Sequence, residues 1–548
     1  MHILFRVMIM INRRTSLFYI ALIMAFTGLL FRTCWLSMGE NATLAKAVIG
    51  NRESKILLYH TKGLIYDANL FPLAGNQPCY YLVINPRDFQ SQNTEQLAEW
   101  TGLDIDFLKK KLKSETPFVL KCETLADAMP GVYMFEGTER YSNLSKHLLG
   151  YLDSAGEVGL SGVEKEYNDY LNLFSSSVYV SYSADAVRGV MAGLGIESIN
   201  TEASANGVVL TLDADLCRAL ESSVNQHIQI GAAIVMNCNT GEIVAATSRP
   251  EYNAENISSY LESTNGELIN RVFSAQTVGS VFKIVVAACA LEAGLEEFRH
   301  VCNGGIVIGD LTFACHNHSG HGEIGLQEAF GESCNSYFIA LGQLLGYDRI
   351  AEMAARFGYG ESVSVLGSMI ASAGTFPEKS SNMALANLSI GQGDLLASPL
   401  QVARMTAVIA NGGSLPAVSL YKGLYLNGEL KIAEKIEEGE QILSAEIAEK
   451  MRQYCVYTVE EGTGTAAKPT VGSAGGKTAS AQTGIIENGE EKLNVYFTGF
   501  YPAEDPQYVI TIYAEDGESG GKTCGPVFRE ICDFMAENGL TEGKTVVY

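Results

Sequence analysis

The first clear pattern along the chain is an uncharged apolar run at residues 15–31, directly after Arg13 and Arg14. Its seventeen residues reach the short end of a membrane span. Arg32 could extend its head group to the interface, so that the helix continues to Met38. Because the arginines stand on the leading side, we expect the N-terminus in the cytoplasm and the rest of the chain outside.

A cleaved signal peptide is the alternative interpretation of this run. Ala45-Lys46-Ala47 has the small-x-small pattern of a cleavage site, but it lies far beyond the apolar residues. We therefore expect residues 1–37 to be a cytoplasmic N-terminus followed by a retained single-pass transmembrane anchor.

Beyond the anchor, the periodicity changes along the chain. Residues 50–205 are mixed and moderately polar, whereas two apolar runs in 230–248 predict a β-hairpin. Residues 280–460 show mostly helical patterns, 475–516 favours strands, and 528–539 favours a terminal helix. Strands on both sides of a long helical middle predict one α+β domain. In it, the 230–248 hairpin shares an antiparallel sheet with the strands of 475–516.

Composition narrows the functional classes. The 548 residues are too many for one ordinary core, and 47% hydrophobic with 18% charged residues is a globular composition. A net charge of −24 argues against nucleic-acid binding, which needs a basic face. Many of the twelve cysteines stand in apolar runs, so most are expected to be buried thiols. Cys302 and Cys315 are the best-placed candidate disulfide pair, across a turn-rich loop.

Candidate chemistry begins at Ser280 and Lys283, in the stretch "GSVFKIVV". Lys283 is the only charged residue between Val281 and Leu291. In a helix that begins near Ser280 the two side chains lie on one face, and the helix N-terminus favours an oxyanion. Apolar surroundings lower the pKa of a lysine, and a neutral lysine beside a serine is a nucleophile with its base. A lysine whose stem packs while its head reaches water is the alternative.

Two later segments complete the pattern. "GESCNSYFIALG" places Ser333 and Asn335 at the start of another apolar helix, and "GGKTASAQTG" places Lys477 and Thr478 on an expected strand. The Ser-x-x-Lys spacing occurs elsewhere in the chain, so it has little weight alone. The three motifs in this order are far more specific.

With these motifs the sequence resembles the class B penicillin-binding proteins, the transpeptidase-only type. The resemblance extends from about residue 50 to about residue 530. Further segments with family counterparts in the same order are 62–74, 159–171, 240–253, 315–330, 389–413 and 496–502. The resemblance implies an α+β, penicillin-binding-protein/β-lactamase-like transpeptidase domain, with an antiparallel sheet flanked by helices and a helical subdomain. We expect this domain at 206–548, after an N-terminal pedestal (dimerisation-like) domain at 38–205.

The resemblance also implies a role for each residue of the first two motifs. Ser280 would attack the penultimate carbonyl of a D-Ala-D-Ala stem peptide, with Lys283 taking its proton. Ser333 would relay the proton toward the leaving D-alanine, and Asn335 would hold Lys283 and the substrate backbone. An amine of a neighbouring stem would then resolve the acyl-enzyme and form a cross-link.

The third motif would bind the substrate. Lys477 and Thr478 would contact the terminal carboxylate, and the N–H groups of Ser280 and Ser480 would form an oxyanion hole. Ala479 stands where the family has glycine, so we expect an added methyl on a strand that approaches the substrate closely. Ser480 replaces the usual threonine conservatively.

No cofactor and no metal are expected. Cys315, His316, His318 and His321 in "CHNHSGH" are zinc-ligand types. A hydrogen-bonded glycine-rich loop is the favoured interpretation, because the resembled family has this stretch without a metal. The implied partners are peptidoglycan stem peptides, β-lactams and a membrane lipid-II polymerase (a glycosyltransferase). The implied location is the cell membrane, with the bulk of the chain extracytoplasmic.

Two function classes remain open at this point. The first is a serine-type D-Ala-D-Ala transpeptidase that penicillin inhibits covalently. The second is a membrane-anchored β-lactam sensor or an inactive cell-wall scaffold of the same fold, for which Ala479 is the main argument. A β-lactamase is a weaker third possibility, because a membrane anchor and a long N-terminal module are not needed for hydrolysis.

Overall fold

The chain forms two compact units. The computed structural model describes residues 2–38, 53–75, 77–122, 129–141, 144–183, 190, 196–199, 204–433, 439–487 and 489–541. Unit 1 consists of Met1–Tyr59, Pro78–Thr138 and Ser177–Glu202. Unit 2 consists of His60–Gln77, Glu139–Ser176 and Ala203–Tyr548. Segments before residue 206 therefore contribute to both units.

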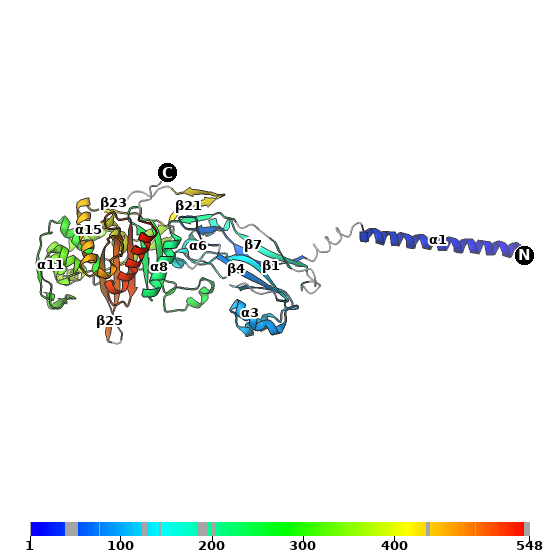
Figure 1. Cartoon of the computed structure of the whole chain (residues 1–548), viewed down its shortest axis with the longest axis horizontal. Coiled ribbons are helices and arrows are strands. Elements are labelled where there is room, and N and C mark those ends of the chain that lie inside the picture. Colours follow the sequence, from blue (N-terminus) through cyan, green and yellow to red (C-terminus); the bar gives the residue numbers. More distant parts are fainter. Residues whose placement is uncertain are drawn as a thin grey trace. The chain divides into compact units, whose positions relative to one another are not determined.

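Helix α1 (His2–Met38) contains the run that we expected to cross a membrane. Within it, Arg13–Trp35 has 23 residues and a mean hydropathy of 1.8, and its side chains are exposed. At 1.5 Å per residue this stretch is about 34 Å long, enough for a hydrocarbon core of about 30 Å. By length and composition it therefore fits a membrane-spanning helix; it is blue in Figure 1.

Unit 1 is built on two three-stranded sheets, in the orders β1-β7-β8 and β5-β4-β6. The strands are β1 (Glu53–Thr61), β4 (Gln77–Ile84), β5 (Phe118–Cys122), β6 (Val132–Glu139), β7 (Ser176–Ser183) and β8 (Ile196–Ile199). Leu82 of β4 packs with Leu97 of α3 (Thr94–Thr101) and Leu108 of α4 (Ile105–Lys111), and all three leucines are fully buried. The second sheet and these two helices therefore share one small core.

The central sheet of unit 2 has five strands in the order β11-β10-β26-β25-β24. They are β10 (Gly231–Asn237), β11 (Ile243–Arg249), β24 (Gly475–Glu487), β25 (Glu490–Tyr501) and β26 (Tyr508–Glu515). Every pairing is antiparallel, including that of β10 with β26. The expected sheet shared by the 230–248 hairpin and the strands of 475–516 is thus confirmed.

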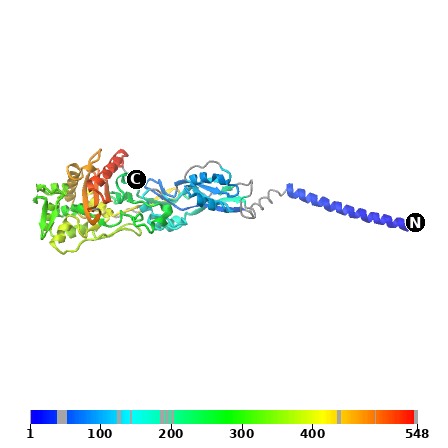
Figure 2. The same ribbon diagram turned by 90° about the horizontal axis from the view of Figure 1, so that it is seen from below.

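Helices cover both faces of this sheet. Phe497 of β25 packs against Phe528 of α16 (Gly525–Glu537), with ring centroids 4.6 Å apart. The next residue, Thr498, shares a 2.7 Å hydrogen bond with Thr406 of α14 (Pro399–Ala410). Because consecutive strand residues point to opposite faces, α16 and α14 lie on opposite sides of the sheet. Helix α8 (Ala214–His227) packs beside α16, as Figures 1 and 2 show.

The segment 280–460 supplies the expected helices. They are α9 (Lys283–Glu292), α10 (Leu326–Gly331), α11 (Asn335–Leu345), α12 (Tyr347–Arg356), α13 (Asn382–Ser389), α14 and α15 (Ala445–Glu460). Short strand pairs interrupt them, which the helical reading of this segment did not anticipate. In one pair, β14 (Gly305–Ile308) turns into β15 (Leu311–Ala314) at Gly309, whose φ of +58° favours glycine.

The remaining strands of unit 2 are short. A second five-stranded sheet has the order β22-β21-β9-β2-β3. Its strands are β2 (Leu64–Tyr66), β3 (Pro72–Ala74), β9 (Gly207–Leu210), β21 (Tyr421–Leu426) and β22 (Glu429–Ile432). Two-stranded pairs are β12 (Gln276–Thr277) with β19 (Leu396–Ala397), β13 (His300–Cys302) with β16 (Gly322–Ile324), β17 (Val363–Leu366) with β18 (Met369–Ala371), and β20 (Ser414–Leu415) with β23 (Glu440–Gln441).

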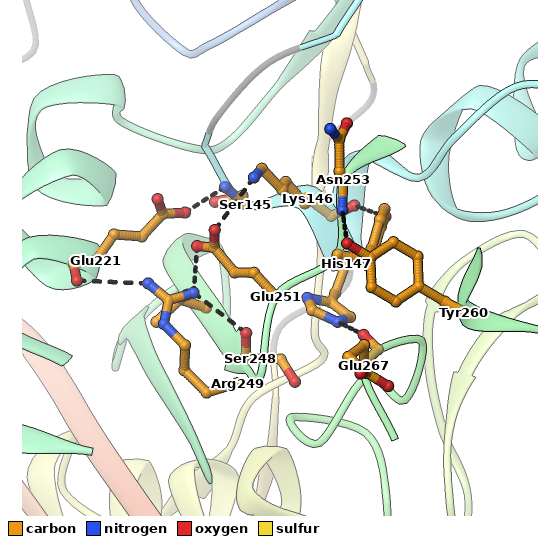
Figure 3. A network of polar contacts seen from close by, with 12 residues as sticks. Ser145, Lys146, His147, Glu221, Ser248, Arg249, Glu251, Asn253, Tyr260 and Glu267 are labelled. Atoms are coloured by element: carbon orange, nitrogen blue, oxygen red, sulfur yellow. Dashed lines mark hydrogen bonds and ion pairs between the residues drawn. The ribbon is translucent and has the colours of Figure 1, made fainter. Parts of the chain in front are cut away.

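A buried polar network joins the segment at Ser145 to the central sheet (Figure 3). The Ser145 N–H donates to Glu221 Oε1 at 2.6 Å, and its hydroxyl donates to Ala246 O at 2.9 Å. Lys146 Nζ lies 3.1 Å from Glu251 Oε2, and Glu251 also pairs with Arg249. Ser145 has a φ of +47°, which is strained for a residue other than glycine, so these bonds hold an unfavourable backbone conformation in place.

Burial sets the ionisation of this network. It raises the pKa of Glu221 to about 7, because the carboxylate loses water. It lowers the pKa of His147 to about 4, so the imidazole is neutral at pH 7 and its Nε2 donates to Glu267 O at 2.7 Å. The short helix α5 (Lys146–Leu149) is therefore docked on the sheet by neutral and paired groups.

Candidate active site

Ser280 lies in the 3₁₀ turn η3 (Gly279–Phe282), directly before α9. The expected helix start near Ser280 is therefore this tighter turn, and the α-helix begins at Lys283. Gly279 has a φ of +59°, and a Cβ there would lie 2.9 Å from the Cβ of Ala481. Only glycine lets the turn come this close to β24. Within the described chain, the partly exposed Ser280 hydroxyl has no hydrogen-bond partner, so it is available to a ligand.

Lys283 is fully buried on the first turn of α9. Its Nζ lies 2.7 Å from Ser333 O, 2.8 Å from Asn335 Oδ1 and 3.3 Å from Ser333 Oγ. Burial lowers the pKa of Lys283 to about 7, because the ammonium form loses its hydration. The expected desolvated lysine is present, and its head group does not reach water.

A neutral amine can make the two short contacts of Lys283. A neutral amine has two N–H groups and one lone pair, whereas carbonyl and amide oxygens can only accept. The two short contacts, to Ser333 O and Asn335 Oδ1, use both N–H groups of Lys283. The lone pair then remains for a hydroxyl, which is what a general base requires.

Ser333 lies in the turn between α10 and α11, and Asn335 is the first residue of α11. Ser333 has a φ of +53°, a strained value for serine that is held by the bond from Lys283 to its carbonyl. Asn335 Nδ2 donates to Ala314 O at 3.2 Å, so its Oδ1 is the atom that faces Lys283. The turn therefore holds the amine of Lys283 in place, and the lysine holds the backbone of Ser333 in place.

The third motif lies on β24, at the free edge of the central sheet. Lys477 is fully buried, its Nζ donates to Thr478 O at 3.0 Å, and it lies 5.5 Å from the centre of the Phe330 ring. Burial lowers the pKa of Lys477, and the charge of Lys283 lowers it further. Thr478 Oγ1 lies 2.6 Å from Thr463 Oγ1.

Ala479 stands at the position where the resembled family has glycine. It is 3% exposed and belongs to the buried core. Gly520 packs against its backbone so closely that a Cβ on Gly520 would lie 2.6 Å from Ala479 O. The methyl is therefore almost fully buried, although Ala479 is also one of the residues that line the cavity described below, whereas Ser480 is exposed.

The motifs meet at one cavity of about 470 Å³. Among the expected site residues, those that line it are Ser280, Ser333, Asn335, Thr478, Ala479 and Ser480. Lys283 and Lys477 are fully buried and are not among the lining residues. Residues of the wall that the sequence analysis did not assign are His316, Gly462, Thr463, Thr465, Ala466, Ser519, Gly520, Gly521 and Lys522. The polar and small composition of "GTGTAA", just before the third motif, is the signal that could have indicated part of this wall.

A cluster of sulfur and nitrogen atoms adjoins the Ser333–Asn335 turn. Cys302, Cys315, His321 and Cys334 each offer a ligand atom, and these atoms lie within 4.8 Å of one another. Cys315 Sγ is 3.6 Å from His321 Nδ1 and 3.9 Å from Cys334 Sγ. His321 Nε2 is buried and has no hydrogen-bond partner among the described residues.

This cluster is a ligand set of the kind that binds zinc. Three thiolates and one imidazole form tetrahedral sites, in which Zn–S bonds of about 2.3 Å place donors roughly 3.8 Å apart. The sequence analysis grouped Cys315 with three histidines and considered a disulfide between Cys302 and Cys315. In the structure those two cysteines are free thiols, and only His321 of the three histidines joins them. His316 instead lies with His321 and Glu332.

The sequence analysis expected no metal, whereas this cluster predicts about one zinc ion per molecule in the full chain, purified in detergent under reducing conditions and measured by elemental mass spectrometry. Replacing Cys302 with serine, or His321 with alanine, should remove most of that zinc and lower the melting temperature. His318→Ala is the matched control, because this histidine is in the same loop and outside the cluster. A metal-free protein whose melting temperature a chelator leaves unchanged would contradict the expectation.

Comparison with known proteins connects this geometry to a family. The family described as "Penicillin binding protein transpeptidase domain" matches residues 231–533, more than half of the chain. "Penicillin-binding Protein dimerisation domain" matches residues 59–191. The peptidoglycan D,D-transpeptidase MrdA of Acinetobacter baumannii is 27% identical, over 85% of this chain and 80% of its own length. The stage V sporulation protein D of Bacillus subtilis is 26% identical, over 89% and 80% of the two chains.

Solved structures share the fold. A D,D-transpeptidase domain of a peptidoglycan glycosyltransferase from Eggerthella lenta has a TM-score of 0.63 and 24% identity, and covers 88% of this chain and 99% of its own. The penicillin-binding protein PBP2 of Helicobacter pylori, solved in complex with MreC, has a TM-score of 0.62 and 23% identity, with 89% and 99% covered. The matched domains and the fold thus agree with the three motifs gathered at one cavity, and the chain belongs to the penicillin-binding protein transpeptidase family as a class B penicillin-binding protein.

Proposed function

We propose that the protein is a peptidoglycan D,D-transpeptidase that works through an acyl-enzyme on Ser280. The observation that carries the proposal is the fully buried Lys283, whose pKa of about 7 makes it a base at neutral pH, close to a cavity lined by Ser280 and Thr478. The relatives named as peptidoglycan D,D-transpeptidases support this reaction class.

In the acylation step, Ser280 Oγ attacks the penultimate carbonyl carbon of a D-Ala-D-Ala stem, and its proton moves to Lys283 Nζ. The developing oxyanion is held by the N–H groups of Ser280 and Ser480. The C–N bond then breaks, the leaving D-alanine amine takes a proton that Lys283 delivers through Ser333, and the acyl group remains on Ser280. The 3.3 Å contact from Lys283 Nζ to Ser333 Oγ supports this route for the proton.

In the second step, the amine of a neighbouring stem attacks the ester carbonyl. Lys283 accepts the proton that the amine loses, the C–O bond to Ser280 breaks, and Ser280 Oγ is protonated again. The result is a cross-link in place of the original D-Ala-D-Ala bond. Asn335 holds Lys283 during both steps, which its 2.8 Å contact with the lysine supports.

The third motif binds the acyl donor, which is the stem peptide that ends in D-Ala-D-Ala. Thr478 donates to the terminal carboxylate, and Lys477, buried beside it, supplies positive charge when protonated. Ala479 belongs to the buried core and also lines the cavity, so it is still the main argument for an inactive scaffold. The alternative is a sensor that keeps the acyl-enzyme, and the first experiment below distinguishes such a sensor from a transpeptidase.

We also propose that α1 anchors the protein in the cell membrane, with the bulk of the chain on the outer side. Arg13 and Arg14 on the leading side of the apolar window support this orientation. A membrane lipid-II polymerase is the partner that the family resemblance implies; the related structure from Helicobacter pylori is a complex with MreC.

The first prediction is covalent labelling at Ser280. Benzylpenicillin should add to the wild-type protein, because its strained amide occupies the place of D-Ala-D-Ala, and Ser280→Ala should abolish the adduct in intact-mass spectra. Lys283→Ala should slow acylation by ~10²–10⁴-fold, the usual loss when a general base is removed. Cross-linked product formed from lipid-II polymer separates the enzyme from a sensor. A folded protein that takes up no β-lactam would overturn the proposal.

The second prediction concerns pH. Since the pKa of Lys283 is lowered to about 7, its neutral fraction grows as pH rises through 7. Acylation should therefore accelerate ~10-fold per pH unit below that value and level off above it. Glu221 also titrates near 7, so Glu221→Gln is the control, and it should keep the same profile. An acylation rate that does not change between pH 5.5 and 8.5 would rule out Lys283 as the base.

The third prediction concerns the membrane. A reporter fused after residue 548 should be active on the outer side of the membrane, and the mature protein should retain residues 16–31. Protein recovered without detergent, with an N-terminus near Ala47, would show a cleaved signal peptide instead. Exchanging Arg13 and Arg14 for glutamate should weaken the orientation bias, because basic flanking residues set topology.

A further inference from the structure

Thr463 is a cavity residue that the roles above do not use. It lies in the connection between α15 and the 3₁₀ turn η4 (Thr465–Ala467), and its N–H donates to Gly331 O at 3.1 Å. Gly462 approaches the same carbonyl so closely that a Cβ there would lie 2.5 Å from Gly331 O. The connection is thus docked on the end of α10, next to the turn that carries Ser333.

The hydroxyl of Thr463 has two neighbours. It lies 3.2 Å from Gly331 O and 2.6 Å from Thr478 Oγ1. A carbonyl oxygen only accepts, and a hydroxyl has a single proton to donate. Both contacts are made only when Thr463 donates to Gly331 O and Thr478 donates to Thr463. In this arrangement the proton of Thr478 points at Thr463 and not into the cavity.

A carboxylate bound at the third motif changes this arrangement of hydrogen bonds. It too can only accept, so Thr478 must turn its proton from Thr463 toward the ligand. Thr463 can then turn its own proton from Gly331 O to Thr478 Oγ1. Gly331 O keeps the bond from the Thr463 N–H, so no buried acceptor is left without a donor.

We propose that Thr463 is a positioning residue for the acyl donor: its hydroxyl reverses from Gly331 O to Thr478 Oγ1 when a carboxylate binds, and so directs the proton of Thr478 at that carboxylate. The inference rests on the proposed function, because it takes the carboxylate-binding role of Thr478 from there. Hydrogen bonds in a chain polarise one another, so the bond from Thr463 strengthens the bond from Thr478 to the anion.

The test compares two β-lactams that differ only at the group in question, benzylpenicillin and its methyl ester. Thr463→Val keeps the shape and removes the hydroxyl. The acylation efficiency of Thr463→Val with benzylpenicillin should fall ~10-fold, the scale of a lost hydrogen bond that serves a charged group. With the ester it should stay within about 2-fold of wild type, because an ester makes no charge-assisted bond.

Two further variants make the result specific. Thr463→Ser restores the hydroxyl, and its acylation should return to within about 2-fold of wild type with both ligands. Thr470→Val is the matched control, because Thr470 lies between η4 and β24 and loses a 2.9 Å bond to Asp533 outside the cavity. Melting temperatures verify folding, and Thr463→Ala replaces Thr463→Val if the valine variant does not fold.

The outcomes are distinguishable. Equal losses with both ligands would show a merely structural role and overturn the inference, as would an unchanged rate with benzylpenicillin. In either case the wild-type adduct at Ser280 would still stand, so the proposed function would survive. A wild-type protein that forms no adduct would remove the proposed function and this inference with it.

Discussion

The site depends on the burial of one amine. Lys283 has no exposed surface, and a charged lysine without water is costly unless it is paired. Among the residues that the structure describes, no carboxylate is a hydrogen-bond partner of Lys283; Ser333 and Asn335 supply oxygens instead. The amine therefore lowers its pKa to about 7 and is neutral for much of the time at neutral pH. Burial of the amine is thus what makes it available as a base at neutral pH.

This constraint explains the turn between α10 and α11. Ser333 keeps a strained φ of +53° because its carbonyl must meet Lys283. Cys334 stands between Ser333 and Asn335 in the sequence. Its thiol belongs to the cluster with Cys302, Cys315 and His321. The same short turn therefore serves the base through its polar residues and the cysteine–histidine cluster through its thiol. A ligand that orders this cluster therefore also orders Ser333 and Asn335, the partners of Lys283.

Another residue with a strained backbone, much earlier in the chain, also holds two parts of the structure together. Ser145, with a φ of +47°, is tied to α8 through Glu221 (Figure 3) and to β11 through Ala246 O. A segment that precedes most of unit 2 in sequence is in this way fixed to its central sheet. Loop closure over such distances is entropically costly, so a dense set of buried bonds is needed to hold the segment.

The sequence alone determined the order of motifs, the α+β class and the strands of the 230–248 hairpin and of 475–516, because strand periodicity and turn residues are local signals. It also indicated that Lys283 is desolvated, since its neighbours on α9 are apolar. It did not determine that Ala479 is almost fully buried, because the burial of a strand residue depends on what packs against the strand. Only the tertiary structure brought Cys302 and Cys334 to His321, and Thr463 to Thr478, since each pair is joined by folding and not by spacing. Contacts between residues distant in the chain follow from the packing of whole elements, and no local pattern encodes them.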